Sequence, residues 1–292
     1  MIEFIKVIIL GIVQGITEFL PISSTGHLII ASSLLNFAHS SGGTFEIFIQ
    51  LGSVLAVVAY YRADLLRQVR TVHRDRGVQK LWLAIVIASI PAALAGFLVR
   101  DTIKENLYKA DGNTNATGLA VIAIALIIGG IIFIVMERVR ARRINPIEVT
   151  TKTEVTPEQA DLESITLRQA VGVGIAQMFA LVPGVSRSGA SIVGGLLSGM
   201  NRPTATKFSF YLSIPVLGGA TILDLLLSLD EITSEAGILS LILGTVVTAI
   251  VSWFAIDWLV RYVARNDFTL FGVYRIILGG IILLLGAAGL LG

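Results

Sequence analysis

Six stretches of this chain are long enough and apolar enough to cross a lipid bilayer as helices. A spanning helix needs about 20 predominantly apolar residues, because the hydrocarbon core is about 30 Å thick. Only 14% of the 292 residues are charged, against about 25% in ordinary soluble domains. We therefore predict an all-α polytopic membrane protein with a single integral membrane domain. The expected spans are about 45–61, 81–99, 118–136, 208–228, 238–260 and 270–291.

The composition also argues against several classes of function. The net charge is only +2, and no basic face remains outside the loops, so nucleic acid is not expected as a partner. The sequence has no cysteine, which excludes disulfides and thiolate metal sites. We expect no organic cofactor. The first 20 residues lack a small-residue cleavage site, so we do not expect a signal peptide there.

Two further apolar stretches, residues 4–37 and 168–199, are interrupted by turns rich in Ser, Gly and Pro. The apolar arms on either side of each turn are short. Irregular backbone at membrane depth is tolerated only where it is buried in protein or lines a wet cavity. Each stretch is therefore predicted to be a re-entrant helix–loop–helix hairpin. The alternative is a pair of ordinary spans joined by a tight turn.

The two broken stretches resemble each other at an offset of 163 residues. The corresponding pairs are Gln14 and Gln177, Ser23 and Ser186, Ser24 and Arg187, and Gly26 and Gly189. Each half would contain one hairpin and three crossings, and because three is odd the second half would have the opposite orientation. We predict inverted-topology repeats, about 1–143 and 168–292, joined by a linker over 144–167. This arrangement would bring the two polar loops together inside the bilayer.

The distribution of Lys and Arg sets the expected orientation. Loops 62–80 and 137–168 contain six Lys or Arg residues each, whereas loop 100–117 on the opposite side contains three. Cytoplasmic loops usually carry the excess of positive charge. We therefore expect a multi-pass protein of the plasma (inner) membrane with both termini on the outer face.

Ionisable side chains inside membrane segments are costly to bury, so each is a candidate functional residue. Glu18, His27 and Arg187 lie in or beside the two polar loops. Gln14 and Glu18 are four residues apart and would share one helix face. Four other ionisable residues have no motif around them, and we interpret them as structural pairing or interface positions. They are Glu46, Asp224, Asp257 and Arg275.

The polar loops are typical of anion sites. A helix that restarts inside a membrane presents unpaired N–H groups and the positive end of its dipole. Glycines allow the backbone to approach a ligand closely, and Ser and Thr can cap the helix or bind phosphate oxygens. The guanidinium of Arg187 matches phosphate geometry, although a structural role in holding the loops together is the alternative. The candidate substrate-binding residues are Gln14, Ser23, Thr25, Gly26, Gly184, Ser186, Ser188 and Ser191.

These residue types favour phosphoryl transfer by hydrolysis. Arg187 would neutralise charge on the transferred group. Ser24 and His27 could form a nucleophile–base pair, with direct attack by His27 as the alternative. Glu18 would hold the tautomer of His27, or help to bind a divalent cation such as Mg²⁺ or Ca²⁺. The candidate catalytic residues are therefore Glu18, Ser24, His27 and Arg187.

The motifs QGITEFLPISSTGH (14–27) and PGVSRSGAS (183–191) resemble the two signature motifs of the undecaprenyl-diphosphate phosphatases of the bacitracin-resistance family. The resemblance runs over nearly the whole chain. It implies hydrolysis of a polyprenyl diphosphate to the monophosphate and phosphate, which recycles the lipid carrier of cell-wall peptidoglycan synthesis and gives bacitracin resistance. It also implies a site that opens toward the outer face. The active-site residues that it implies are Glu18, Ser24, His27, Ser186 and Arg187.

Two positions depart from the usual pattern of that family. Gln14 stands where many members have Glu, which weakens any mechanism that needs two carboxylates and favours Glu18 as the main acid. Ser191 stands where many members have Thr, and the hydroxyl is kept.

We therefore expect a membrane phosphatase whose partners are a polyprenyl diphosphate lipid and the bilayer, and the sequence also permits a homodimer. Inverted repeats with broken helices are a transporter design as well. The alternative function is thus a transporter or flippase of an anionic polyprenyl lipid. A structural scaffold is a third possibility, against which the concentration of polar groups argues.

Overall fold

The computed structural model describes residues 2–35, 37, 44–107, 114–143, 161–227 and 235–291, and its regular structure there is helical. This agrees with the predicted all-α class. The helices are α1 (Ile2–Thr17), α2 (Ser24–Leu35), α3 (Thr44–Tyr60), α4 (Arg62–Thr71), α5 (Arg76–Leu107), α6 (Ala116–Arg143), α7 (Leu167–Met178), the 3-10 turn η3 (Phe179–Leu181), α8 (Arg187–Leu197), α9 (Arg202–Leu227), α10 (Glu235–Arg265) and α11 (Thr269–Ala287).

Four of these helices are long and apolar enough to cross a membrane, namely α5, α6, α10 and α11. They coincide with four of the six predicted spans. A fifth span is formed if α3 and α4 count as one helix, bent by 71° at Tyr61. The sixth expected span falls on α9, a 26-residue helix that contains Pro215 and is not among the four.

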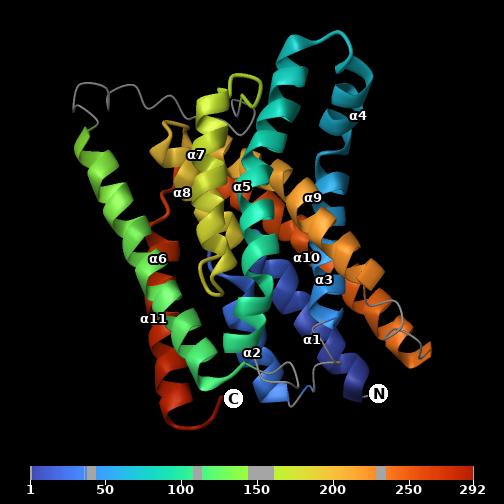
Figure 1. Cartoon of the computed structure of the whole chain (residues 1–292), viewed down its shortest axis with the longest axis vertical. Coiled ribbons are helices and arrows are strands. Elements are labelled where there is room, and N and C mark those ends of the chain that lie inside the picture. The colour runs from blue at the N-terminus through green and yellow to red at the C-terminus, as the bar shows by residue number, and fades with distance from the viewer. Residues whose placement is uncertain are drawn as a thin grey trace.

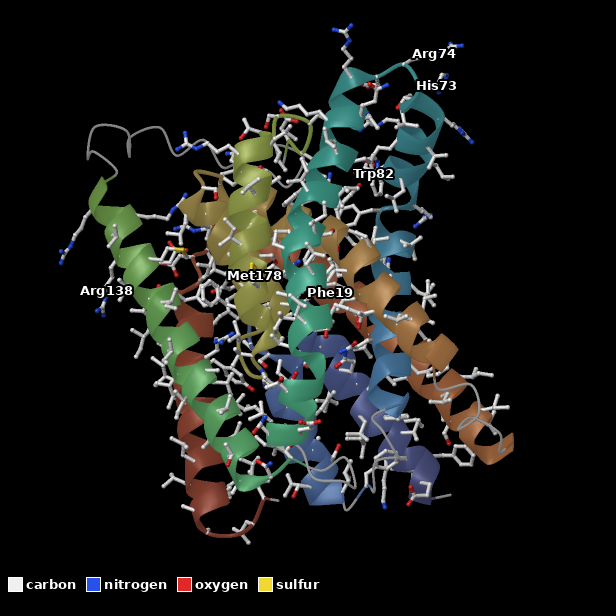
Figure 2. All side chains as sticks on the ribbon, viewed as in Figure 1. Phe19, His73, Arg74, Trp82, Arg138 and Met178 are labelled. Carbon is white, nitrogen blue, oxygen red and sulfur yellow. The ribbon has the colours of Figure 1, made fainter. Side chains whose placement is uncertain are left out.

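The two broken stretches form helical hairpins at opposite ends of the molecule. In Figure 1, α1 and α2 occupy the lower half, whereas α7 and α8 occupy the upper half. Helix α1 packs mainly against α10, and α7 packs mainly against α5. Both chain ends lie at the lower end in Figure 1, and the side chains of His73 and Arg74 lie at the upper end in Figure 2. The hairpins therefore approach each other from opposite ends.

The breaks in the hairpins have the same local geometry. Ser23 and Ser186 have φ angles of 70° and 74°, and they are the only non-glycine residues with positive φ in the described part of the chain. Their separation is the 163-residue offset of the sequence repeat. The hydroxyl of Ser186 then caps α8 by accepting a hydrogen bond from the Gly189 amide at 3.1 Å. This matching geometry favours the predicted repeat, whose boundaries and inverted orientation stay predictions.

Helices α6 and α11 pack closely because glycines line their contact. A Cβ atom on Gly130 would lie 2.5 Å from the Gly272 carbonyl oxygen, and one on Gly129 would overlap the Arg275 guanidinium. Small residues let helix backbones approach in this way inside membranes. The close approach places Arg275, which is fully buried, between α6 and the two hairpin tips.

Candidate active site

The tips of the two hairpins contact each other directly. The hydroxyl of Ser188 donates to the Leu20 carbonyl at 3.1 Å. The Arg275 guanidinium donates to the carbonyls of Pro21, at 3.2 Å, and Gly184, at 3.0 Å, and so joins one loop to the other. The expected meeting of the polar loops is confirmed by these contacts. The interpretation of Arg275 as a structural position is confirmed as well.

The carboxylate of Glu18 is the centre of the polar network. It is buried, and it accepts hydrogen bonds from three side chains, two on the first hairpin and one on the second. Arg187 donates through Nη2 to Oε1 at 3.0 Å, while Gln14 and Ser24 donate to Oε2 at 3.0 and 2.9 Å. The predicted shared helix face of Gln14 and Glu18 is confirmed. Because Ser24 donates to Glu18, the carboxylate is placed to accept the hydroxyl proton.

Arg187 is held from several sides and still has a free donor. Its Nη1 donates to the Ser209 carbonyl at 3.0 Å, and its guanidinium lies over the Phe19 ring at 5.7 Å. Its Nε is buried without a partner among the described residues. The ion pair with Glu18 does join the two loops, as the structural alternative required. The unpaired N–H nonetheless leaves Arg187 able to bind an anion.

His27 does not make the side-chain contacts that the sequence suggested. Its Nδ1 lies 2.8 Å from the Ser23 carbonyl oxygen, and because a carbonyl only accepts, Nδ1 is the donor. Its Nε2 lies 2.6 Å from the Tyr274 hydroxyl, and the two rings are stacked. The expected Ser24–His27 pair is therefore not formed, and Glu18 does not orient His27. Ser24 contacts the carboxylate instead.

A cavity of about 970 Å³ lies between the hairpin tips and helices α3, α5 and α9. Seven of the predicted site residues line it, namely Glu18, Ser23, Ser24, Thr25, Gly184, Ser186 and Arg187. The other five lie outside its described wall, namely Gln14, Gly26, His27, Ser188 and Ser191. Four of those five have side chains that bond within the protein. Gln14 and His27 do so as described above, Ser188 donates to the Leu20 carbonyl, and Ser191 contacts the Ser209 hydroxyl at 2.7 Å.

The remainder of the cavity wall is largely apolar. It is formed by residues of η3, α5 and α9, including Leu181, Ala92, Phe97, Val216 and Leu223. The side chains of Phe97 and Leu223 are also exposed on the outside of the bundle, where lipid would surround a membrane protein. A cavity with an Arg–Glu–Ser cluster and an apolar wall is complementary to an amphiphile with an anionic head.

Sequence reasoning missed several contributors to this arrangement. Gln50, Ser89 and Gln177 supply further polar groups to the cavity wall. Tyr274 binds His27 from α11, and the Ser209 backbone binds Arg187 from α9. These contacts join distant parts of the chain and leave no local pattern in the sequence. Gln177 alone had a signal, since it is the counterpart of Gln14 in the repeat.

A divalent cation would find few protein ligands in this site. Among the described residues, no group of three His, Cys, Asp or Glu side chains could hold a metal. Glu18 is the one carboxylate in the described cavity wall, and both its oxygens already accept hydrogen bonds. Mg²⁺ is often bound by one or two carboxylates plus phosphate oxygens of the substrate. The residues thus fit a cation only if the ligand supplies most of the coordination.

The fold and the site together define a polytopic helical membrane protein with a buried Arg–Glu–Ser cluster between two helical hairpins. Comparison with known proteins identifies the family. The model of the bacitracin resistance protein BacA matches residues 7–281, and the chain belongs to that family.

Relatives of similar length carry one activity in their names. The undecaprenyl-diphosphatase of Deinococcus radiodurans is 44% identical over 292 residues, which cover 99% of this chain and 97% of that protein. The undecaprenyl-diphosphatase of Deinococcus deserti is 41% identical and covers 99% and 98%. Undecaprenyl-diphosphatase 1 of Burkholderia cenocepacia is 40% identical over 285 residues, 97% of this chain and 96% of that protein.

Proposed function

We propose that this protein hydrolyses undecaprenyl diphosphate to undecaprenyl phosphate and inorganic phosphate. This reaction recycles the lipid carrier of peptidoglycan synthesis and gives bacitracin resistance, as membership of the family implies. The observation that carries the proposal is the Arg187–Glu18–Ser24 cluster on the wall of a cavity whose other walls are apolar. The cluster suits the diphosphate, and the apolar walls suit the prenyl chain.

In the mechanism that we propose, Ser24 is the nucleophile and Glu18 is its base. The Ser24 hydroxyl proton passes to Glu18, and Oγ attacks the terminal phosphorus. The bridging P–O bond breaks, and its electron pair leaves with undecaprenyl phosphate. Water then cleaves the phosphoserine, releasing phosphate and restoring the hydroxyl. The Ser24–Glu18 distance of 2.9 Å supports this assignment over His27, which contacts Ser23 and Tyr274 instead.

Arg187 would bind the terminal phosphate and neutralise the charge that develops on it. Arg187 and Ser186 both line the cavity, and the buried Nε–H of Arg187 is unpaired among the described residues. A phosphate that binds the guanidinium competes with Glu18 for it, which leaves the carboxylate free to accept the Ser24 proton. Pre-positioned donors of this kind typically contribute ~100-fold or more to the rate. If a divalent cation takes part, Glu18 and the substrate phosphates would hold it, and it would supply further charge neutralisation.

We also propose the orientation that the charges favour. The basic ends of α4, α5 and α6 would face the cytoplasm, and the termini and the mouth of the cavity would face the outer side of the inner membrane. A homodimer stays a prediction, because the exposed apolar side chains are what lipid-facing helices require in any case.

The proposal is tested by measuring phosphate release from undecaprenyl diphosphate by the purified full chain in detergent. Arg187→Ala is expected to lower the rate by at least ~100-fold, because it removes the phosphate-binding charge. Retained translocation of a polyprenyl phosphate across vesicles, with no phosphate release by the native protein, would support the transporter alternative instead.

A further inference from the structure

Gln177 is a polar side chain of the cavity wall to which the mechanism above gives no role. It lies in the last turn of α7 (Leu167–Met178), next to the η3 turn that leads into the second loop. The neighbouring Met178 lies about midway along the molecule, near the level of Phe19 in the first loop (Figure 2). Gln177 is 1% exposed, and it lines the same cavity as Arg187 and Ser186.

Both polar atoms of the Gln177 amide lack a partner. Neither Nε2 nor Oε1 has a hydrogen-bond partner among the described residues. A buried polar group left in this state typically costs about 1–3 kcal/mol, so such groups are rare unless a ligand or water binds them. The amide therefore points to a polar ligand in the cavity.

Two other buried amides in the described part of the chain donate to protein groups, although the Gln14 Oε1 also lacks a partner there. Gln68, which lies outside the cavity wall, donates to the Tyr211 hydroxyl and accepts from the Trp82 indole at 3.1 Å. Gln14, the counterpart of Gln177 in the first hairpin, donates to Glu18. No carboxylate stands at the equivalent place in the second hairpin, where residue 181 is Leu. The donor of Gln177 is thus left for a ligand that enters the cavity.

We infer that Gln177 binds the diphosphate group of the substrate beside Arg187, an inference that rests on the proposed function. Nε2 would donate to a phosphate oxygen. Oε1 would accept from a water or a protonated phosphate oxygen next to it. A neutral amide suits this place because it binds an anion through its donor without adding negative charge near Glu18. Gln177 is then a substrate-binding residue from the second hairpin, as Ser24 is a reacting residue from the first.

Two variants of the full chain in detergent test the inference by steady-state phosphate release. Gln177→Leu keeps the approximate volume and removes both polar atoms. It is expected to lower kcat/KM about 10- to 100-fold, the effect of losing a hydrogen bond to a charged group. Gln177→Glu is expected to lower it further, because a carboxylate would repel the phosphate.

Thermal unfolding separates binding from a structural role. Gln177→Leu is expected to leave the melting temperature unchanged or raise it, because it removes an unpaired buried amide. Thr206→Val is the matched control, since the Thr206 hydroxyl is also buried and unpaired among the described residues but lies outside the cavity wall. Its kcat/KM should equal that of the native protein. A lowered melting temperature with an unchanged KM in Gln177→Leu would overturn the inference.

Binding of inorganic pyrophosphate distinguishes this inference from the proposed function. Pyrophosphate is expected to raise the melting temperature of the native protein and to raise that of Gln177→Leu much less. This result would support a phosphate contact at Gln177 even if the native protein failed to hydrolyse the lipid. Equal stabilisation of both proteins, together with equal kcat/KM, would show that Gln177 makes no contact with the phosphate groups.

Discussion

The three hydrogen bonds to Glu18 decide what its neighbours can do. Ser24 and Gln14 donate to one oxygen, and Arg187 donates to the other. An amide at position 14 is well suited to this network, because a second carboxylate there would face Glu18 with like charge. The Gln that departs from the usual family pattern thus supports a mechanism with a single carboxylate, in which Glu18 serves Ser24.

Substitutions of Ser24 and His27 test which residue is the nucleophile. Ser24→Ala is expected to lower the rate of phosphate release by at least ~100-fold, because the attacking oxygen is lost. His27→Ala is expected to lower it less, since the ring nitrogens bond to the Ser23 carbonyl and the Tyr274 hydroxyl and not to Ser24. Ser33→Ala, on the same helix but near Leu290, is the control. A larger loss for His27→Ala, or an acid-labile phosphohistidine trapped by rapid quenching, would contradict the Ser24 assignment.

The sequence predicted some of these contacts and could not predict others. Gln14, Glu18 and Ser24 are close in the chain, so helix periodicity and the turn place them together. Arg187 was expected near them because the predicted repeat would bring the two polar loops together. His27 lies in the first turn of α2, as predicted, but it does not pair with Ser24, because three-residue spacing fixes neither the ring's direction nor the presence of Tyr274, which is 247 residues away in the chain. Long-range partners of this kind depend on packing that local patterns do not record.

At the scale of helices, the features that the sequence predicted were the long apolar helices and the breaks in the two hairpins. Pro, Ser and Gly marked both breaks correctly, because each disfavours a continuous helix. Helix α4 was missed, because its charged residues suggested a loop, although Arg, Leu and Gln are good helix formers. Glu46 and Asp224 have side chains outside the described part, whereas Asp257 accepts from Tyr60 and pairs with Arg261 as a structural position would.

The contact between α6 and α11 should be sensitive to a single methyl group. Gly130→Ala is expected to lower the free energy of unfolding by about 1–3 kcal/mol, because the added Cβ would overlap the Gly272 carbonyl. Gly280→Ala on α11 is the control, since its Cβ would meet no atom within 4 Å, and Ala favours helix. Thermal unfolding in detergent measures both. Equal melting temperatures for the two variants would show that the helices can separate without cost.

For the molecule as a whole, two buried arginines join the hairpins in different ways. Arg275 donates to backbone carbonyls of both loops and of α6, including Ala125 at 3.3 Å and Gly184 at 3.0 Å. Arg187 pairs with the Glu18 side chain and lines the cavity. The first set of bonds would persist whether or not substrate is bound, whereas the second would be exchanged with the phosphate. Architecture and phosphate binding are therefore assigned to separate residues.

Lysine substitutions separate these two roles. A lysine keeps the charge but cannot reproduce the fork of donors. Arg275→Lys is expected to lower the free energy of unfolding by about 2 kcal/mol or more, because several buried carbonyls lose their donor, while the molecules that remain folded keep most of their activity. Arg187→Lys is expected to lose ~100-fold in rate with a smaller change in melting temperature, because the charge opposite Glu18 is kept. Thermal unfolding and phosphate release, measured on the same preparations, would reject this division if Arg275→Lys proved stable but inactive.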